Sequence, residues 1–317
     1  MAKNLVIVEA PTKSKFLDAF KQHLQDNDFS PLTVQGYLSD VKVFCAWFER
    51  NNGRQTELEL ITPTDMREYR QYLLTVEKRS ANTVNRKLAA LSTLMRWGVD
   101  CGRIASDPMS RVKTVRVTRG APTPKWLDKT EQLALQRAIE RDLQLAKIRF
   151  PRRWVTRQRD ASLVVFLLHT GLRLNEATAL QTSDIQISSR KGSVLIRQGK
   201  GGKQRSVPLN TEARKALQDW YAVRPESEFV WTEVEGNEGS SLTGRTIQRM
   251  LERYAIDANL ESLSPHILRH SFAKNLVNAG VGLEKVAALL GHKNLNAMRV
   301  YVAPGEKDLE TAMEELV

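Results

Sequence analysis

Apolar residues between positions 16 and about 105 recur every three or four places, and no alternating apolar and polar run occurs there. This spacing is typical of amphipathic α-helices, because residues three and four apart share one face. The predicted stripes are Tyr37, Val41, Phe44 and Phe48; Met66, Tyr69, Leu73 and Val76; and Val84, Leu88, Leu91 and Met95. Thr62 before Pro63, and Ser80, are candidate N-caps. We therefore predict a compact module of four short helices.

A basic stretch from Asp107 to Pro124 contains Pro108, Gly120 and Pro122, and predicts an exposed connector. It divides the chain into an appended segment, residues 1–15, a helical domain, residues 16–107, a basic linker, residues 108–125, and a second domain, residues 126–317. The second domain ends in an acidic segment, residues 305–317, with the pattern of a short amphipathic helix.

The sheet signal of the second domain lies between Asp184 and Leu209. Three short strands, residues 184–188, 193–198 and 204–208, are separated by turns rich in glycine and lysine. The predicted fold class is mainly α, with an N-terminal four-helix domain and an α+β domain that carries a small three-stranded antiparallel sheet.

The charge of the chain indicates the kind of partner that it binds. The net charge is +12 and the isoelectric point about 9.8, which is typical of a nucleic-acid binder. Residues 110–125 contain five basic side chains and no acid, and residues 141–159 contain seven and one. Each run alone is equally compatible with a solvated face. The candidate DNA contacts are Arg86, Lys87, Arg111, Lys113, Arg116, Arg152, Arg153 and Lys203.

The two cysteines, Cys45 and Cys101, lie in separate apolar helical patterns, so we expect both in the core and neither a disulfide nor a cysteine-based zinc site. No apolar run reaches eighteen residues and no secretory core is present, which predicts a cytoplasmic, nucleoid-associated protein with no membrane partner.

Three short segments carry candidate chemistry. In the first, an apolar helix breaks at Gly171 and places Arg173 at the start of the next helix, where a guanidinium suits a phosphate. The alternative is a structural ion pair between Arg173 and Glu176. In the second, Pro265 fits the first helical position, which puts His266 and Arg269 on one face.

The spacing of His266 and His270 also occurs in zinc sites, but the glutamate of such motifs and a third ligand are absent, so we expect no metal. In the third segment, Gly291 and His292 are followed nine residues later by Tyr301. A phenol, with a pKa near 10, is a poor nucleophile unless positive charge lowers the cost of ionising it.

These segments resemble the tyrosine recombinases and phage-type integrases, particularly the Xer-like members without an arm-binding domain. The resemblance covers nearly the whole chain from about residue 16. In that family the constellation is Arg, Lys, His-x-x-Arg, His or Trp, then Tyr. The matching residues here are Arg173, Lys200, His266, Arg269, His292 and Tyr301.

The resemblance implies strand exchange without metal, ATP or another cofactor. Tyr301 would attack the scissile phosphate to form a 3′-phosphotyrosyl bond, and a 5′-hydroxyl of a partner strand would reverse the step. Arg173 and Arg269 would bind the non-bridging oxygens. Lys200 would protonate the leaving oxygen, His266 would assist proton removal from Tyr301, and His292 would hydrogen-bond the phosphate. Glu176 and His270 would orient these groups.

The implied partner is double-stranded DNA with inverted-repeat core sites, bound by a homo-tetramer that assembles on DNA from monomers. The implied strand exchange passes through a Holliday junction. Accessory DNA-bending or directionality proteins belong to the same expectation. Residues 305–317 would dock on a neighbouring protomer, and the alternative is that they pack on their own domain. Residues 1–15 also resemble the opening strand of a type IA topoisomerase metal domain, over a dozen residues, and we interpret them as a short appended segment.

Two alternatives stay open at this stage: a type IB topoisomerase that relaxes DNA, and a catalytically idle DNA-binding regulator. A complete constellation argues against the regulator, and the Xer-like helical module argues against the topoisomerase. The DNA target, the accessory factors and the choice among integration, excision and resolution of a mobile element or replicon are not encoded in these motifs.

Overall fold

The computed structural model describes residues 16–116, 124–188, 190–197, 204–291 and 298–302. Contacts divide the chain into two compact units, residues 1–121 and 122–317, and the division falls inside the predicted linker. Residues 1–15 and 305–317, for which an appended segment and a tail helix were predicted, lie outside the described residues.

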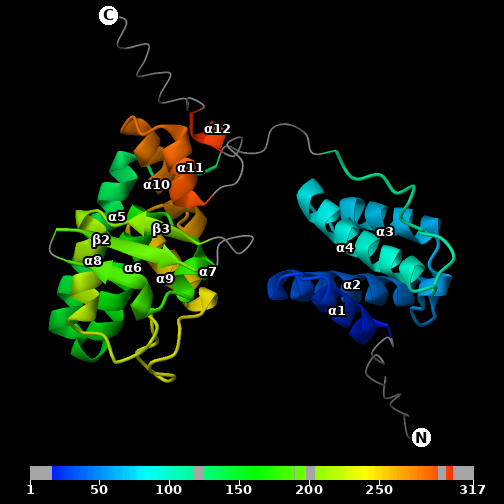
Figure 1. The fold of residues 1–317 in the computed structure, drawn as a ribbon, viewed down its shortest axis with the longest axis horizontal. Helices are drawn as coiled ribbons and strands as arrows, with labels where there is room; N and C mark the ends of the chain where they lie inside the picture. Colours follow the sequence, from blue (N-terminus) through cyan, green and yellow to red (C-terminus); the bar gives the residue numbers. More distant parts are fainter. Residues whose placement is uncertain (1–15, 117–123, 189, 198–203, 292–297, 303–317) are drawn as a thin grey trace, which may run out of the picture. The chain divides into compact units, whose positions relative to one another are not determined.

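The first unit contains α1 (Leu17–Asp26), α2 (Pro31–Asn52), the 3-10 turn η1 (Leu58–Leu60), α3 (Pro63–Thr75) and α4 (Ala81–Asp100) (Figure 1). Both predicted caps are present. The Thr62 hydroxyl accepts from the Asp65 backbone N–H, and the Ser80 hydroxyl accepts from the Thr83 backbone N–H. Such caps satisfy backbone donors that the first helical turn leaves unpaired.

The predicted apolar stripes form the core of this unit, with Phe44, Tyr69 and Leu91 fully buried. Two predictions are wrong. Val76 is 66% exposed, because α3 ends at Thr75 and Val76 caps it instead of continuing the stripe. Cys101 is exposed while Cys45 is buried, because α4 ends at Asp100 and Cys101 follows its last turn.

The second unit is mostly helical. It runs through α5 (Lys129–Arg149), η2 (Pro151–Arg153), α6 (Trp154–Thr170), α7 (Leu174–Thr178), η3 (Thr182–Asp184), β1 (Ile185–Ile187), β2 (Gly192–Ile196), β3 (Arg205–Pro208), α8 (Thr211–Tyr221), α9 (Gly244–Asp257), α10 (Pro265–Asn278), α11 (Leu283–Leu290) and α12 (Arg299–Val302). The mainly helical fold with one small sheet agrees with the predicted fold class.

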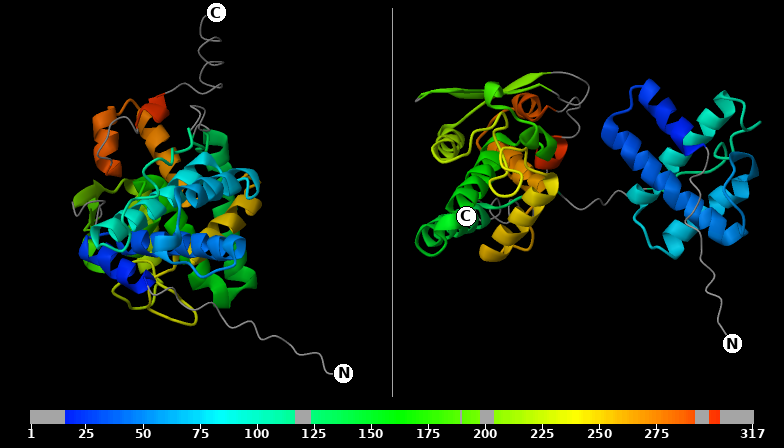
Figure 2. Two further views of the ribbon diagram at one scale, coloured as in Figure 1. Left: turned by 90° about the vertical axis from the view of Figure 1, so that its right-hand side faces the viewer. Right: turned by 90° about the horizontal axis from the view of Figure 1, so that it is seen from below.

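The three strands pair in the order β1-β2-β3, and both pairings are antiparallel, as predicted. Val194 of the middle strand faces Ile185 on one side and Val207 on the other, and its side chain is fully buried. The right-hand view of Figure 2 shows the strands as one layer along one side of the helices of this unit.

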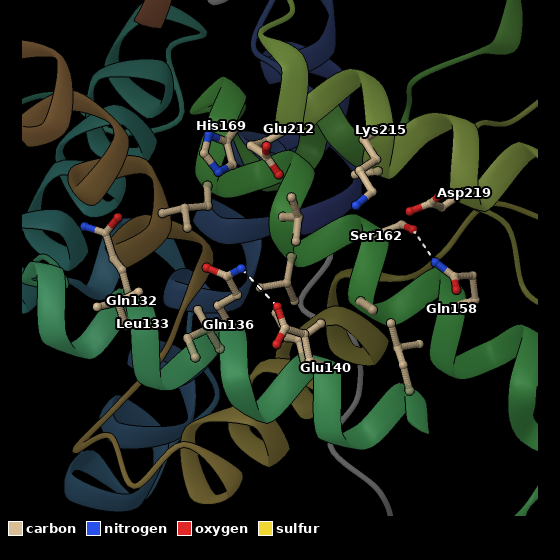
Figure 3. A pocket seen from close by; sticks show the side chains of 18 of the residues that line it. Gln132, Leu133, Gln136, Glu140, Gln158, Ser162, His169, Glu212, Lys215 and Asp219 are labelled. Atoms are coloured by element: carbon tan, nitrogen blue, oxygen red, sulfur yellow. Dashed lines mark hydrogen bonds between the residues drawn. The ribbon is translucent and has the colours of Figure 1, made fainter. Parts of the chain in front are cut away.

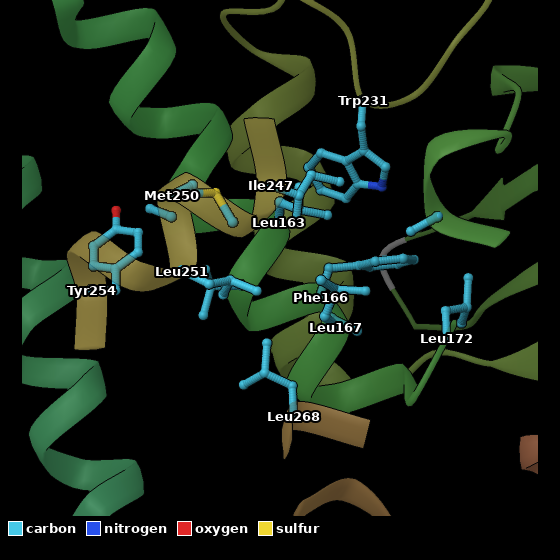
Figure 4. Packing of buried hydrophobic residues seen from close by; sticks show 14 of the residues in the cluster. Leu163, Phe166, Leu167, Leu172, Trp231, Ile247, Met250, Leu251, Tyr254 and Leu268 are labelled. Atoms are coloured by element: carbon cyan, nitrogen blue, oxygen red, sulfur yellow. The ribbon is translucent and has the colours of Figure 1, made fainter. Parts of the chain in front are cut away.

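α6 lies at the centre of the second unit. Leu163, Phe166 and Leu167 are buried, and they pack with side chains of α9 and with Trp231 (Figure 4). A smaller apolar cluster forms where α10, α11 and α12 lie side by side (Figure 1), and it includes Phe272, Leu290 and Tyr301. The C-terminal end of α6 therefore reaches the cluster that holds Tyr301, because Gly171 lies against Phe272 and Leu290.

Candidate active site

The turn between α6 and α7 positions Arg173. α6 ends at Gly171, whose φ of 62° is a left-handed conformation that favours glycine. Arg173 is the N-cap of α7, as predicted, and its backbone N–H donates to the Glu176 carboxylate at 2.9 Å. Its side chain is 30% exposed and also donates to Glu176, at 2.9 Å. The ion pair considered as an alternative is thus present, and it leaves part of the guanidinium accessible.

Glu176 holds a second arginine that sequence analysis missed. Arg205, at the start of β3, donates through Nη1 and Nη2 to the two carboxylate oxygens, at 2.9 and 2.7 Å. Its Nε donates to the Leu289 carbonyl at 3.0 Å. Burial raises the pKa of Glu176, but the hydrogen bonds from Arg205 and Arg173 outweigh it and lower that pKa to about 2. Glu176 is therefore ionised at any physiological pH.

Arg269 is buried, at 5% exposure, and bonds to backbone carbonyls. Nη1 donates to the Gly171 carbonyl and Nη2 to the Leu290 carbonyl, each at 2.6 Å. Burial and the charges of Arg173 and Arg205 lower the pKa of Arg269 to about 10, so it stays protonated at neutral pH. One carboxylate thus stands among three guanidiniums, and this excess of positive charge suits a phosphate group.

Tyr301 lies in the small apolar cluster and is 2% exposed. Its hydroxyl contacts Nδ1 of His270 at 2.5 Å. Burial raises the pKa of Tyr301 against the lowering effect of Arg269. Burial, together with His266 and Arg269, lowers the pKa of His270. His270 was expected to orient other groups, and the structure places it directly on the Tyr301 hydroxyl.

His266 is exposed at the start of α10, where Ser264 is the N-cap and Pro265 the first helical residue, as predicted. The structure therefore brings together Arg173, Glu176, Arg269, His270 and Tyr301. Lys200, Lys203 and His292, which complete the predicted site and DNA contacts, lie outside the described residues.

The candidate DNA contacts differ in their surroundings. Arg111, Lys113, Arg116, Arg152 and Arg153 are exposed. Arg86 is half exposed and donates to Asp40 at 3.0 Å, whereas Lys87 is 8% exposed and pairs with the same carboxylate at 3.1 Å. Lys87 therefore contributes to the core of the first unit. In the arginine-rich run, Arg159 is likewise buried, and it pairs with Asp160 at 2.8 Å.

A cavity of about 630 Å³ opens between α5, α6 and α8 (Figure 3). Its lining includes His169, Glu140 and Lys215, and it includes none of the described residues of the arginine cluster. Asn210 contacts His169 at 3.0 Å, and burial lowers the pKa of that histidine. None of Arg173, Glu176, Arg269, His270 and Tyr301 lines this cavity, so the candidate chemistry does not use it.

Within the described residues, no three His, Cys, Asp or Glu side chains gather in a way that could hold a metal ion. Over the same part of the chain, no helix is both long and apolar enough to cross a membrane.

Comparison with known proteins identifies the family. Residues 143–307 match the phage integrase family, and residues 16–101 match the phage integrase N-terminal SAM-like domain. The chain is 31% identical over 310 residues to the tyrosine recombinase XerC of Chlorobaculum parvum (strain DSM 263 / NCIMB 8327), covering 91% of this chain and 90% of the relative. It is 24% identical to the TnP I resolvase of Bacillus thuringiensis, covering 94% and 98%.

The fold is also similar to a solved structure of the XerH site-specific recombinase bound to a palindromic difH substrate after cleavage. The TM-score is 0.70, the identity 21%, and the match covers 94% of each chain. The chain belongs to the phage integrase family. It is an Xer-like tyrosine recombinase, an enzyme of site-specific DNA recombination.

Proposed function

We propose that Tyr301 cleaves one DNA strand by transesterification and forms a 3′-phosphotyrosyl bond, with the arginine cluster holding the scissile phosphate. The observation that carries this proposal is the grouping of Arg173, Arg269 and Tyr301 from three separate motifs. Arg269 donates to the carbonyls of Gly171 and Leu290, Arg173 donates to the carbonyl of Gly291 at 3.3 Å, and Tyr301 lies in the apolar cluster that includes Leu290. Donors that are fixed before the reaction stabilise developing charge without a reorganisation cost.

In this proposal Arg173, the more exposed arginine, and Arg269 bind the non-bridging oxygens. Arg205 and Glu176 hold Arg173 in place through the shared carboxylate. Lys200 protonates the leaving 5′ oxygen, and His292 hydrogen-bonds the phosphate. No ATP is consumed, since a phosphotyrosyl bond conserves the energy of the broken phosphodiester, and the proposed charge stabilisation comes from side chains without a metal or other cofactor.

The proposed substrate is double-stranded DNA with inverted-repeat core sites. Four copies of the chain assemble on it, and the strand exchange that they catalyse passes through a Holliday junction. The first unit, with the exposed Arg86, Arg111, Lys113 and Arg116, supplies phosphate contacts, and Arg152 and Arg153 supply others from the second unit. Accessory proteins set the direction. The task is integration, excision or resolution of a mobile element or replicon, and the relatives named as a resolvase and as XerC support it.

A nicked suicide substrate tests the nucleophile, because the short strand diffuses away after cleavage and traps the covalent complex. The wild type should form the complex, and Tyr301→Phe should bind the same DNA without forming it. Tyr221→Phe is a matched control, since the buried Tyr221 hydroxyl has no hydrogen-bond partner among the described residues. Trapping by Tyr301→Phe would overturn the proposal. Relaxation of any supercoiled plasmid without junction intermediates would overturn the recombination role.

A further inference from the structure

The contact between His270 and Tyr301 is the basis of a further inference. His270 Nδ1 and the Tyr301 hydroxyl are 2.5 Å apart, and the ring centroids are 5.5 Å apart. The family motif instead points to His266 for the tyrosine proton, yet that side chain is exposed one helical turn earlier on α10. Within the described residues, the hydrogen bond of the Tyr301 hydroxyl is to His270.

We propose that Nδ1 of His270 accepts the Tyr301 proton during cleavage and returns it during strand joining. This inference rests on Tyr301 being the nucleophile, as proposed above. A neutral phenol donates its proton, and a neutral imidazole accepts at one nitrogen while it donates at the other. The proposal requires the His270 tautomer with hydrogen on Nε2 and a lone pair directed at Tyr301.

The electrostatic surroundings agree with this direction of transfer. Among the described residues, the charged and titratable groups facing the pair are His266, Arg269 and Lys274 on α10, and Lys274 Nζ donates to the Tyr301 carbonyl at 3.5 Å. Burial together with His266 and Arg269 lowers the pKa of His270. The imidazole is therefore neutral at pH 7 and free to take a proton. Burial raises the pKa of Tyr301, so the phenol needs a base. An incoming phosphate adds negative charge, which favours protonated His270 as the reaction proceeds.

The step balances without another reactant. The Tyr301 O–H bond breaks and its proton moves to His270, while the O–P bond forms and the P–O5′ bond breaks. The leaving 5′ oxygen takes its proton from a different group, Lys200 in the scheme above. In joining, a 5′-hydroxyl gives its proton to the now neutral Lys200 as the O5′–P bond forms and the bond from phosphorus to the tyrosine oxygen breaks, and protonated His270 returns its proton to that oxygen. His266 is then left to contact the phosphate.

The test compares His270→Asn with His266→Asn in single-turnover cleavage of the suicide substrate. Asparagine keeps a hydrogen-bonding oxygen near the place of Nδ1 but does not accept a proton at neutral pH. His270→Asn should cleave at least about 100-fold more slowly, in the range of general-base contributions. A substrate with sulfur in place of the bridging 5′ oxygen, whose leaving group needs no proton, should not restore the rate.

The pH profile supplies a second measurement that needs no variant. The wild-type rate should rise with pH below about 6.5 and then level off, since the neutral imidazole is the active form. His266→Asn should keep that inflection, whereas His270→Asn should lose it and continue to rise into alkaline solution. A wild-type rate that does not fall on acidification, cleavage by His270→Asn at the wild-type rate, or its rescue by the sulfur substrate would each overturn the inference. A wild type that forms no covalent complex would instead refute the nucleophile itself.

Discussion

Replacing Gly171 by alanine should destabilise the second unit by about 2–5 kcal/mol. The left-handed conformation at φ 62° costs an alanine about 1–2 kcal/mol. A Cβ at this position would also lie 2.4 Å from Phe272 Cδ1 and 2.9 Å from Leu290 Cδ2, distances at which these side chains must shift. Overpacking of this kind typically costs about 1–3 kcal/mol more.

Gly280→Ala is the matched control in the same unit. Its φ of 77° is equally left-handed, but an added Cβ would meet nothing within 4 Å, so only the backbone cost of about 1–2 kcal/mol should remain. Urea unfolding followed by tryptophan fluorescence measures both variants. Equal destabilisation of the two, within about 0.5 kcal/mol, would refute the steric argument. Gly171→Ala should also slow cleavage, because Arg269 donates to the Gly171 carbonyl, and Gly280→Ala should not.

Three further predictions use the same structure. Glu176, despite its burial, has a pKa of about 2 against an ordinary 4.5, so its contribution to stability is present above pH 4.5 and is lost as pH falls toward 2. Glu176→Gln should remove that part of the acid dependence and cost about 3 kcal/mol at pH 7, measured by urea unfolding across pH. Arg205→Lys should lower the cleavage rate at least about tenfold, because a lysine does not reproduce the bidentate bond. Arg197→Lys, directly after β2, changes a half-exposed arginine that pairs with Asp184 outside the candidate site, and this variant should cleave normally. A thiol reagent should label Cys101 rapidly and Cys45 only after unfolding; equal rates would contradict the burial of Cys45.

Local features of the fold were predictable from the sequence because each depends on residues within one helical turn. Thr62, Ser80, Pro265 and Gly171 act as the caps and breaks that their residue types indicate. The wrong assignment of Val76 has the same origin, since a periodic pattern does not reveal the residue at which a helix ends.

The residues of the candidate site that lie in the three sequence motifs were predictable, whereas their partners outside the motifs were not. Arg205 was not predictable because it lies 29 residues from Glu176 along the chain and outside the family motifs. A basic residue at the start of a strand carries no signal of its own. The partner of the Tyr301 hydroxyl was also out of reach, since sequence spacing puts His266 and His270 on one face of α10 and only the packing of α12 decides between them.

The carbonyls that hold Arg269 have a consequence for how such a site can change. Gly171 and Leu290 accept through their backbone oxygens, and every amino acid carries a backbone oxygen. No side-chain substitution at either position deletes the acceptor, and only a change in the path of the chain moves it. Directed evolution toward new DNA targets can therefore vary the surrounding surface widely, while the two carbonyl acceptors of this guanidinium stay in place.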